Sequence, residues 1–173
     1  MESAATQIAR QVGELTALIV DDEASMRKVT RALLQSIGIH NVYEASNGTR
    51  GLDLICIRAP DIVILDWEMP NPNGPEFMRR VRSPGNFPLP DVPVIMLTGH
   101  GERSRVVEAV DLGVNEFLLK PVSATALLAR VVSIHIKPRK MVKRADYYGP
   151  EPRKLASYKP HSDDTFRQVY LVN

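Results

Sequence analysis

The body of the chain alternates five times between a short apolar run and a segment in which apolar residues have helical spacing. The apolar runs predict β-strands at residues 17–20, 41–45, 62–65, 94–98 and 116–119. After the first run, Met26, Val29 and Leu33 recur every three or four residues, as on one face of an amphipathic helix. Gly38 follows as a stop signal for this helix.

Each later strand is also followed by a segment of helical character. Asn47 and Gly48 form a turn before a helix that carries Cys56 on its apolar side. A short basic helix follows the third strand, and the last two helices are expected over about residues 102–112 and 124–135. The position of Cys56 in this pattern predicts a small core residue.

Strands that are apolar throughout and separated by helices indicate a parallel sheet with helices on both faces. The predicted fold class is therefore α/β, with a doubly wound sheet between two helical layers. Sheets of this kind bind ligands outside the carboxyl ends of their strands, where the strand order reverses. The residues that follow each strand are for this reason the first candidates for function.

Polar groups stand at four of the five strand ends. They are Asp21, Asp22 and Glu23 after the first strand, Asp66 after the third, Thr98 (before Gly99) at the fourth, and Lys120 after the fifth. Neighbouring carboxylates repel one another unless a cation joins them, and Mg²⁺ takes one or two carboxylates together with a phosphate oxygen. A reachable carboxylate can attack phosphorus, while a lysine and a hydroxyl share the charge of the phosphoryl oxygens. The set predicts a magnesium-dependent phosphoryl site.

Composition limits the classes of protein and site. With 44% hydrophobic and 24% charged residues, the chain has the balance of a globular protein with a real core. One cysteine and four scattered histidines support neither a disulfide framework nor a zinc site. The first residues lack the pattern of a signal peptide, and no apolar stretch reaches the length of a membrane span. We therefore expect a cytoplasmic protein without membrane insertion.

Charge is distributed unevenly along the chain. Residues 1–136 carry 13 basic and 16 acidic side chains, whereas residues 137–173 carry 9 basic and 4 acidic side chains. The periodic pattern also stops at this boundary. We divide the chain into an N-terminal arm (1–14), a body (15–136) and a basic, proline-containing C-terminal tail (137–173).

Four motifs in the body together carry a family resemblance. They are "IVDDE" after the first strand, "ILDWEMP" after the third, "MLTG" after the fourth and "FLLKPV" after the fifth. In this order they closely resemble the receiver domain of two-component response regulators, the CheY-like group, over about residues 15–136. The resemblance implies a flavodoxin-like (βα)5 fold in three layers, with strand order 2-1-3-4-5.

Carried over to this chain, the resemblance implies the roles of the acids. Asp66 would accept a phosphoryl group from a sensor histidine kinase or a phosphotransfer protein. Asp21, Asp22 and Asp66 would hold Mg²⁺, and the main-chain carbonyl of Glu68 would complete the protein ligands. The chain would catalyse only its own phosphorylation and dephosphorylation, so it is not expected to be an enzyme that acts on other substrates.

The resemblance also implies how the site responds to phosphorylation. Lys120 would pair with a phosphoryl oxygen. Thr98 would bond the phosphoryl group and move on activation, and Phe117 would act as the switch aromatic. Pro121 matches the family proline that follows the lysine through a cis peptide bond. The response would change the surface that binds a downstream protein, which the sequence does not identify.

The tail leaves several functions open. In the first, a receiver-only protein signals through a partner or passes its phosphoryl group along a relay. In the second, which the tail does not favour, its basic residues and interleaved tyrosines bind nucleic acid, although it lacks the two apolar-faced helices of a helix-turn-helix. A third, a magnesium phosphatase similar to the haloacid dehalogenase group, needs a cap domain for which the chain has no room.

The tail has three structural interpretations. It packs back on the body, pairs with a second protomer to form a homodimer, or docks on a partner. Residues 166–172 alternate between polar and apolar side chains, which is typical of an added β-strand.

Overall fold

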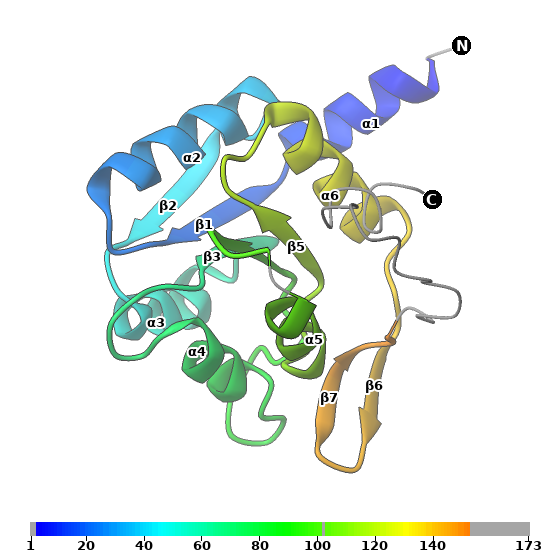
Figure 1. Cartoon of the computed structure of the whole chain (residues 1–173). Helices are drawn as coiled ribbons and strands as arrows, with labels where there is room; N and C mark the ends of the chain where they lie inside the picture. The colour runs from blue at the N-terminus through cyan, green and yellow to red at the C-terminus, as the bar shows by residue number, and fades with distance from the viewer. Residues whose placement is uncertain (1–2, 102, 153–173) are drawn as a thin grey trace, which may run out of the picture.

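The main sheet of the protein is parallel and has five strands. The computed structural model describes residues 3–101 and 103–152. Hydrogen-bonded neighbours follow the order β2-β1-β3-β4-β5 (Figure 1). The strands are β1 (Thr16–Val20), β2 (Asn41–Ala45), β3 (Ile62–Asp66), β4 (Val94–Thr98) and β5 (Glu116–Leu119). The predicted α/β class, the flavodoxin-like strand order and the positions of the five strands are confirmed.

Helices cover this sheet in two layers. The helices in the described residues are α1 (Ala4–Gly13), α2 (Ala24–Ser36), α3 (Gly48–Arg58), α4 (Gly74–Val81), α5 (Arg103–Asp111) and α6 (Ala124–Ile136). One layer holds α1, α2 and α6, and the opposite layer holds α3, α4 and α5 (Figure 1). Within this part of the chain, no helix has both the length and the apolar character that crossing a membrane requires.

The apolar strands serve both layers because alternate side chains point to opposite faces of the sheet. On β3, Ile62 and Ile64 pack in the core beneath α2 and α6, whereas Val63 and Leu65 pack in the core beneath α3 and α4. A strand buried on both faces has no solvent side, which explains its uninterrupted apolar sequence. Asp66, at the carboxyl end of this strand, is the first polar side chain that it presents at the edge of the core.

The N-terminal arm contains a helix that was not predicted from the sequence. Ser3 caps α1, because its hydroxyl accepts a hydrogen bond from the Thr6 N–H at 3.2 Å. Val12 is buried in the core beneath α2 and α6, and Ile8 packs partly buried against the same core. Ile8 and Val12 stand four residues apart, as on one face of a helix, so the sequence did carry a signal by which α1 could have been predicted.

The prediction that Cys56 is a core residue is wrong, because its side chain is exposed. The buried positions of α3 are Gly48, Gly51, Leu54 and Ile55. The helix lies close to β1 at Gly51, where an added Cβ would be 2.8 Å from a methyl carbon of Val20. This approach turns Leu54 and Ile55 toward the core and leaves the next residue, Cys56, on the outer side.

The first part of the predicted tail folds into an antiparallel hairpin. It consists of β6 (Met141–Arg144) and β7 (Tyr147–Pro150). Figure 1 shows the hairpin beside the end of α5, below α6. The strand predicted at residues 166–172 lies outside the described residues.

Two glycines allow the hairpin to contact the loop that precedes β5. A Cβ added to Gly113 would lie 2.5 Å from the Tyr148 carbonyl oxygen, and one added to Gly149 would lie 2.6 Å from the Gly113 Cα. The Tyr148 hydroxyl donates a hydrogen bond to Asp91 in the loop before β4. Tyr148 is one of the aromatic residues on which nucleic-acid binding by the tail would depend, and it is engaged within the molecule.

Gly113→Ala is expected to detach the hairpin from the body. Gly113 has a φ of +76°, and the added Cβ would collide with a backbone atom, the Tyr148 carbonyl oxygen. Gly38→Ala is the matched control, because Gly38 has a φ of +102° but nothing within 4 Å of its Cβ position. Both variants carry the left-handed strain of about 1–2 kcal/mol, and only Gly113→Ala adds the collision.

Hydrogen exchange distinguishes the two glycine variants. The amides of β6 and β7 should exchange faster in Gly113→Ala than in the wild type and should be unchanged in Gly38→Ala. Equal protection of the hairpin amides in both variants would contradict the contact between Gly113 and the hairpin.

Candidate functional site

Three carboxylates meet at the carboxyl ends of β1 and β3. Asp21 and Asp22 follow β1, and Asp66 is the last residue of the adjacent β3. One oxygen from each carboxylate lies within 4.8 Å of those from the other two. Asp21 and Asp66 are 3% and 5% exposed, whereas Asp22 is exposed. The parallel pairing of β1 with β3 therefore brings together acids that are distant in the sequence.

The ammonium group of Lys120 forms ion pairs with two of these acids. Lys120 follows β5, and its Nζ lies 2.8 Å from Asp66 Oδ1 and 3.8 Å from Asp21 Oδ2. The Lys120 backbone N–H donates to the Thr98 carbonyl oxygen at 2.8 Å, which holds the lysine against the end of β4. The peptide bond between Lys120 and Pro121 is cis, as the family resemblance implied.

Burial, hydrogen bonds and neighbouring charges shift the pKa of two groups in this cluster. Burial raises the pKa of Asp21, the hydrogen bond from the Glu23 N–H lowers it, and the charge of Asp66 raises it, with a net increase. Burial lowers the pKa of Lys120, but the hydrogen bond to Asp66 and the charges of the acids raise it above the usual 10.5. One ammonium among three carboxylates leaves the cluster with an excess of negative charge.

This set of donors fits Mg²⁺, which prefers oxygen ligands and usually retains several waters. The carboxylates of Asp21, Asp22 and Asp66 supply oxygen atoms close enough to share one ion. The Glu68 carbonyl accepts no backbone hydrogen bond from the residues that the structure describes. Because Asp22 is exposed, water can reach the ion from that side. A divalent cation here would offset the excess of negative charge.

Thr98 and Phe117 lie inside the protein next to this site. Thr98 ends β4 and is 0% exposed, and its Oγ1 accepts a hydrogen bond from the His100 N–H at 3.1 Å. Phe117 on β5 is buried and packs in the core beneath α4 and α5. The structure therefore brings Thr98 to the same sheet edge as Asp66 and Lys120, and places Phe117 on the adjacent strand.

Three polar side chains near the acids were not identified from the sequence. His100 Nε2 lies 2.8 Å from Glu68 Oε1, and the guanidinium of Arg105 stacks 4.9 Å from the centroid of the buried Trp67 ring. Arg27 donates to the loop that carries Asp21 and Asp22. Its place on the first turn after the acids could have indicated this contact, since helical side chains point back toward the helix start. No local pattern indicates the other two, because their partners lie in another loop.

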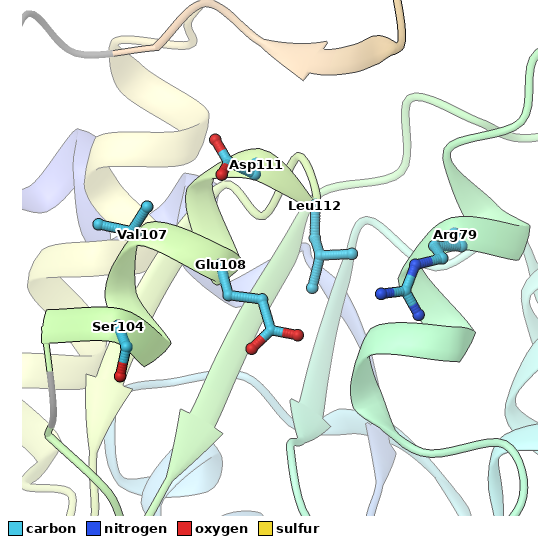
Figure 2. Close-up of a pocket in the computed structure, with 6 residues that line it drawn as sticks. All are labelled: Arg79, Ser104, Val107, Glu108, Asp111 and Leu112. Carbon is cyan, nitrogen blue, oxygen red and sulfur yellow. The ribbon is translucent and has the colours of Figure 1, made fainter.

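A groove of about 670 Å³ lies between α4 and α5 (Figure 2). It is lined by Arg79, Ser104, Val107, Glu108, Asp111 and Leu112. Arg79 extends into the groove from α4, and Glu108 and Leu112 extend into it from the other side (Figure 2). None of the three clustered acids lines this groove, so the candidate chemistry lies at the strand ends and not in this groove.

Comparison with known proteins places the chain in a family. Residues 17–132 match the family model of the response regulator receiver domain. The chain is 35% identical to the chemotaxis protein CheY of Pseudomonas aeruginosa over 117 residues, which are 68% of this chain and 93% of CheY. It is 34% identical over 119 residues to the phosphate regulon transcriptional regulatory protein PhoB of the same species. That match covers 69% of this chain and 51% of PhoB.

Solved structures agree with this family. A putative response regulator from Chloroflexus aurantiacus aligns with a TM-score of 0.64 and 32% identity, over 69% of this chain and 96% of that one. The chemotaxis protein CheY4 of Vibrio cholerae aligns with a TM-score of 0.60 and 29% identity, over 68% of this chain and 95% of that one. From the ordered motifs, the sheet and these matches, the chain belongs to the response regulator receiver domain family of two-component signalling and is CheY-like.

Proposed function

We propose that Asp66 accepts a phosphoryl group from a sensor histidine kinase or a phosphotransfer protein, with Mg²⁺ held by Asp21, Asp22, Asp66 and the main-chain carbonyl of Glu68. One observation carries this proposal: the Asp66 carboxylate ends the central strand, within 4.8 Å of two other acids and 2.8 Å from Lys120 Nζ. A stabilising ion pair would need one acid for one ammonium, whereas this cluster has three acids.

The transfer uses Asp66 as its nucleophile. A carboxylate oxygen attacks the phosphorus of a phosphohistidine and forms an O–P bond, while the P–N bond breaks and its electron pair stays on the imidazole nitrogen, which takes up a proton. Bound Mg²⁺ supplies positive charge to the phosphoryl oxygens. Lys120 supplies a second positive charge from the side of β5. Attack by water on the same phosphorus restores the Asp66 carboxylate, so the chain acts only on its own phosphoryl group.

Thr98 and Phe117 link this chemistry to a binding surface. A phosphoryl group adds strong hydrogen-bond acceptors, to which the Thr98 hydroxyl can donate. Because Thr98 Oγ1 accepts the His100 N–H, a shift of Thr98 moves the loop that leads into α5. Phe117 packs beneath α5 and has to repack, which changes the surface of α5, β5 and α6. Phosphorylation thereby biases an existing equilibrium between two forms of the surface that binds a downstream protein.

Removal of Mg²⁺ tests the proposed site. After incubation with acetyl phosphate and Mg²⁺, intact-mass measurement should show one added phosphoryl group, and excess chelator should prevent this addition. Mg²⁺ alone should also raise the midpoint of thermal unfolding, because a ligand that binds only the folded state stabilises it by mass action. Equal labelling with Mg²⁺ and with chelator would contradict the proposed metal site.

A second measurement tests the link between Asp66 and the surface formed by α5, β5 and α6. Hydrogen exchange in α5 and β5 should change when the wild type is phosphorylated. Thr98→Ala should take up the phosphoryl group without this change, because it lacks the hydroxyl that bonds the new oxygens. Thr98→Ser retains a hydroxyl and should respond like the wild type. A wild-type response in Thr98→Ala would contradict the proposed role of Thr98 in changing the surface of α5, β5 and α6.

A further inference from the structure

Arg27 holds the loop that carries the first two acids. The residue lies on the first turn of α2, and its side chain points back toward β1. Its Nη1 donates to the Asp21 carbonyl oxygen at 2.9 Å and to the Asp22 carbonyl oxygen at 3.2 Å. One guanidinium nitrogen therefore joins two consecutive carbonyl groups, which restricts the orientation of the two peptide planes on either side of Asp22.

The two acids depend on this contact to different extents. The Asp21 carboxylate accepts the Glu23 N–H at 2.8 Å, and the Asp21 N–H donates to the Ala45 carbonyl oxygen at 3.2 Å. The Asp22 side chain is exposed, and within the described residues no hydrogen bond holds its carboxylate. The direction of the Asp22 carboxylate is therefore set by its backbone, which Arg27 holds. Repulsion among three carboxylates favours moving Asp22 away, and the contact with Arg27 opposes that movement.

Glu44 on β2 positions Arg27 and also pairs with Arg31. Glu44 Oε2 lies 3.4 Å from Arg27 Nε, and Glu44 Oε1 lies 2.5 Å from Arg31 Nε. The Arg27 side chain is 17% exposed, so this pair is partly shielded from solvent. Glu44 is shared by Arg27 and Arg31, so the three side chains together keep one net positive charge. The effect of Arg27 on the geometry of the loop is therefore tested by a substitution that keeps its charge.

We propose that Arg27 is a positioning residue for the metal site: it holds the Asp21 and Asp22 carbonyls in the arrangement that directs both carboxylates toward one Mg²⁺. The inference rests on the proposed function, since it concerns the same ion. Residues that orient the ligands of a metal commonly change its affinity by about 10–100-fold when they are replaced. Arg27 does not touch the ion, and its effect is transmitted through the backbone of its neighbours.

Arg27→Lys tests this role because it keeps the positive charge and removes the planar guanidinium group with its several N–H donors. A lysine ammonium cannot bond both carbonyls and Glu44 in the geometry that the guanidinium allows. Arg31→Lys is the matched control: Arg31 also bonds Glu44 and donates to the Val42 carbonyl oxygen at 3.0 Å, but within the described part of the chain no hydrogen bond joins it to the loop of the acids. Calorimetric titration with Mg²⁺ alone, supported by Trp67 emission, measures the affinity of each protein.

We expect Arg27→Lys to weaken Mg²⁺ binding about 10–100-fold and Arg31→Lys to leave it unchanged. Acetyl phosphate labelling of Arg27→Lys should be slow at limiting Mg²⁺ and should return to the wild-type rate at saturating Mg²⁺. A purely structural role would not produce this dependence on the ion. Thermal unfolding in chelator shows whether the two variants are equally well folded.

The remaining outcomes separate this inference from the proposed function. Unchanged affinity in Arg27→Lys, or an equal loss in both variants, overturns the role of Arg27 while the metal site stands. Absence of Mg²⁺ binding in the wild type overturns the proposed function itself. If Arg27→Lys does not fold, Glu44→Gln provides the test. This substitution removes the ion pair that positions Arg27, so it should also weaken Mg²⁺ binding. Wild-type affinity in Glu44→Gln would then overturn the inference.

Discussion

Asp66→Asn will leave the protein folded but unable to take up a phosphoryl group from acetyl phosphate in the presence of Mg²⁺. The amide lacks the negative charge with which the carboxylate attacks phosphorus. The loss should be complete, because the Asp66 carboxylate lies 2.8 Å from Lys120 Nζ, whereas Asp21 Oδ2 lies 3.8 Å away and the Asp21 carboxylate is held by the Glu23 N–H. Intact-mass measurement should show one added phosphoryl group on the wild type and none on Asp66→Asn.

Asp53→Asn is the matched control for this substitution. Asp53 is exposed on α3 and lies outside the acidic cluster, so the same chemical change should leave labelling as in the wild type. Circular dichroism of both variants checks that the fold is retained. An equally stable label on Asp66→Asn would place the phosphoacceptor at another residue.

Arg82→Met is expected to lower the free energy of unfolding by about 3–5 kcal/mol, as breaking a buried charged network usually does. Arg82 is 7% exposed. Its acceptors are the carbonyl oxygens of Gly113, Pro90 and Val92 and the side-chain oxygen Oδ1 of Asn115, at 2.9, 2.6, 2.9 and 2.8 Å. Methionine fills much of the same space without a donor, so the three carbonyl oxygens lose their bonds to Arg82, and Asn115 Oδ1 keeps the bond from the Val94 N–H.

The charge of Arg82 is retained at neutral pH. Burial lowers the pKa of Arg82 to about 10, which is still well above 7. Arg80→Met is the matched control, because Arg80 is exposed on α4 and its replacement should change the free energy of unfolding by less than about 0.5 kcal/mol. Urea unfolding of both variants, followed by Trp67 emission, provides the comparison. Equal free energies would show that the bonds of Arg82 contribute little net stability.

These two substitutions act at opposite ends of the sheet. Asp66 lies at the carboxyl end of β3, whereas the acceptors of Arg82 lie in the segments that precede β4 and β5. The folded fraction of Arg82→Met should therefore still be phosphorylated on Asp66. If labelling of Arg82→Met falls only in proportion to the unfolded fraction, the substitution affects stability and not the site. A larger loss of labelling would indicate an effect on the site.

The sequence by itself determined the sheet and the residues of the candidate site at its edge. Buried parallel strands have apolar side chains on both faces, so each strand is visible as a continuous run such as residues 62–65. Parallel strands end at the same edge, so the residues after such runs meet whatever the details of packing. Asp21, Asp66 and Lys120 could therefore be placed together before any coordinates, and the structure brings their charged atoms within 4 Å of Lys120 Nζ.

Only the tertiary structure decided the contacts that join segments without a repeating pattern. The hairpin meets the body through Gly113 and Tyr148, and nothing in either local sequence indicates the other. Cys56 faces outward because α3 approaches β1 at a glycine, which depends on packing and not on periodicity. Long side chains such as Arg27 and Arg82 can point to many acceptors, and the backbone carbonyls that they bond are the same in every residue. Such partners become defined only when the fold brings particular carbonyl groups within reach of each guanidinium.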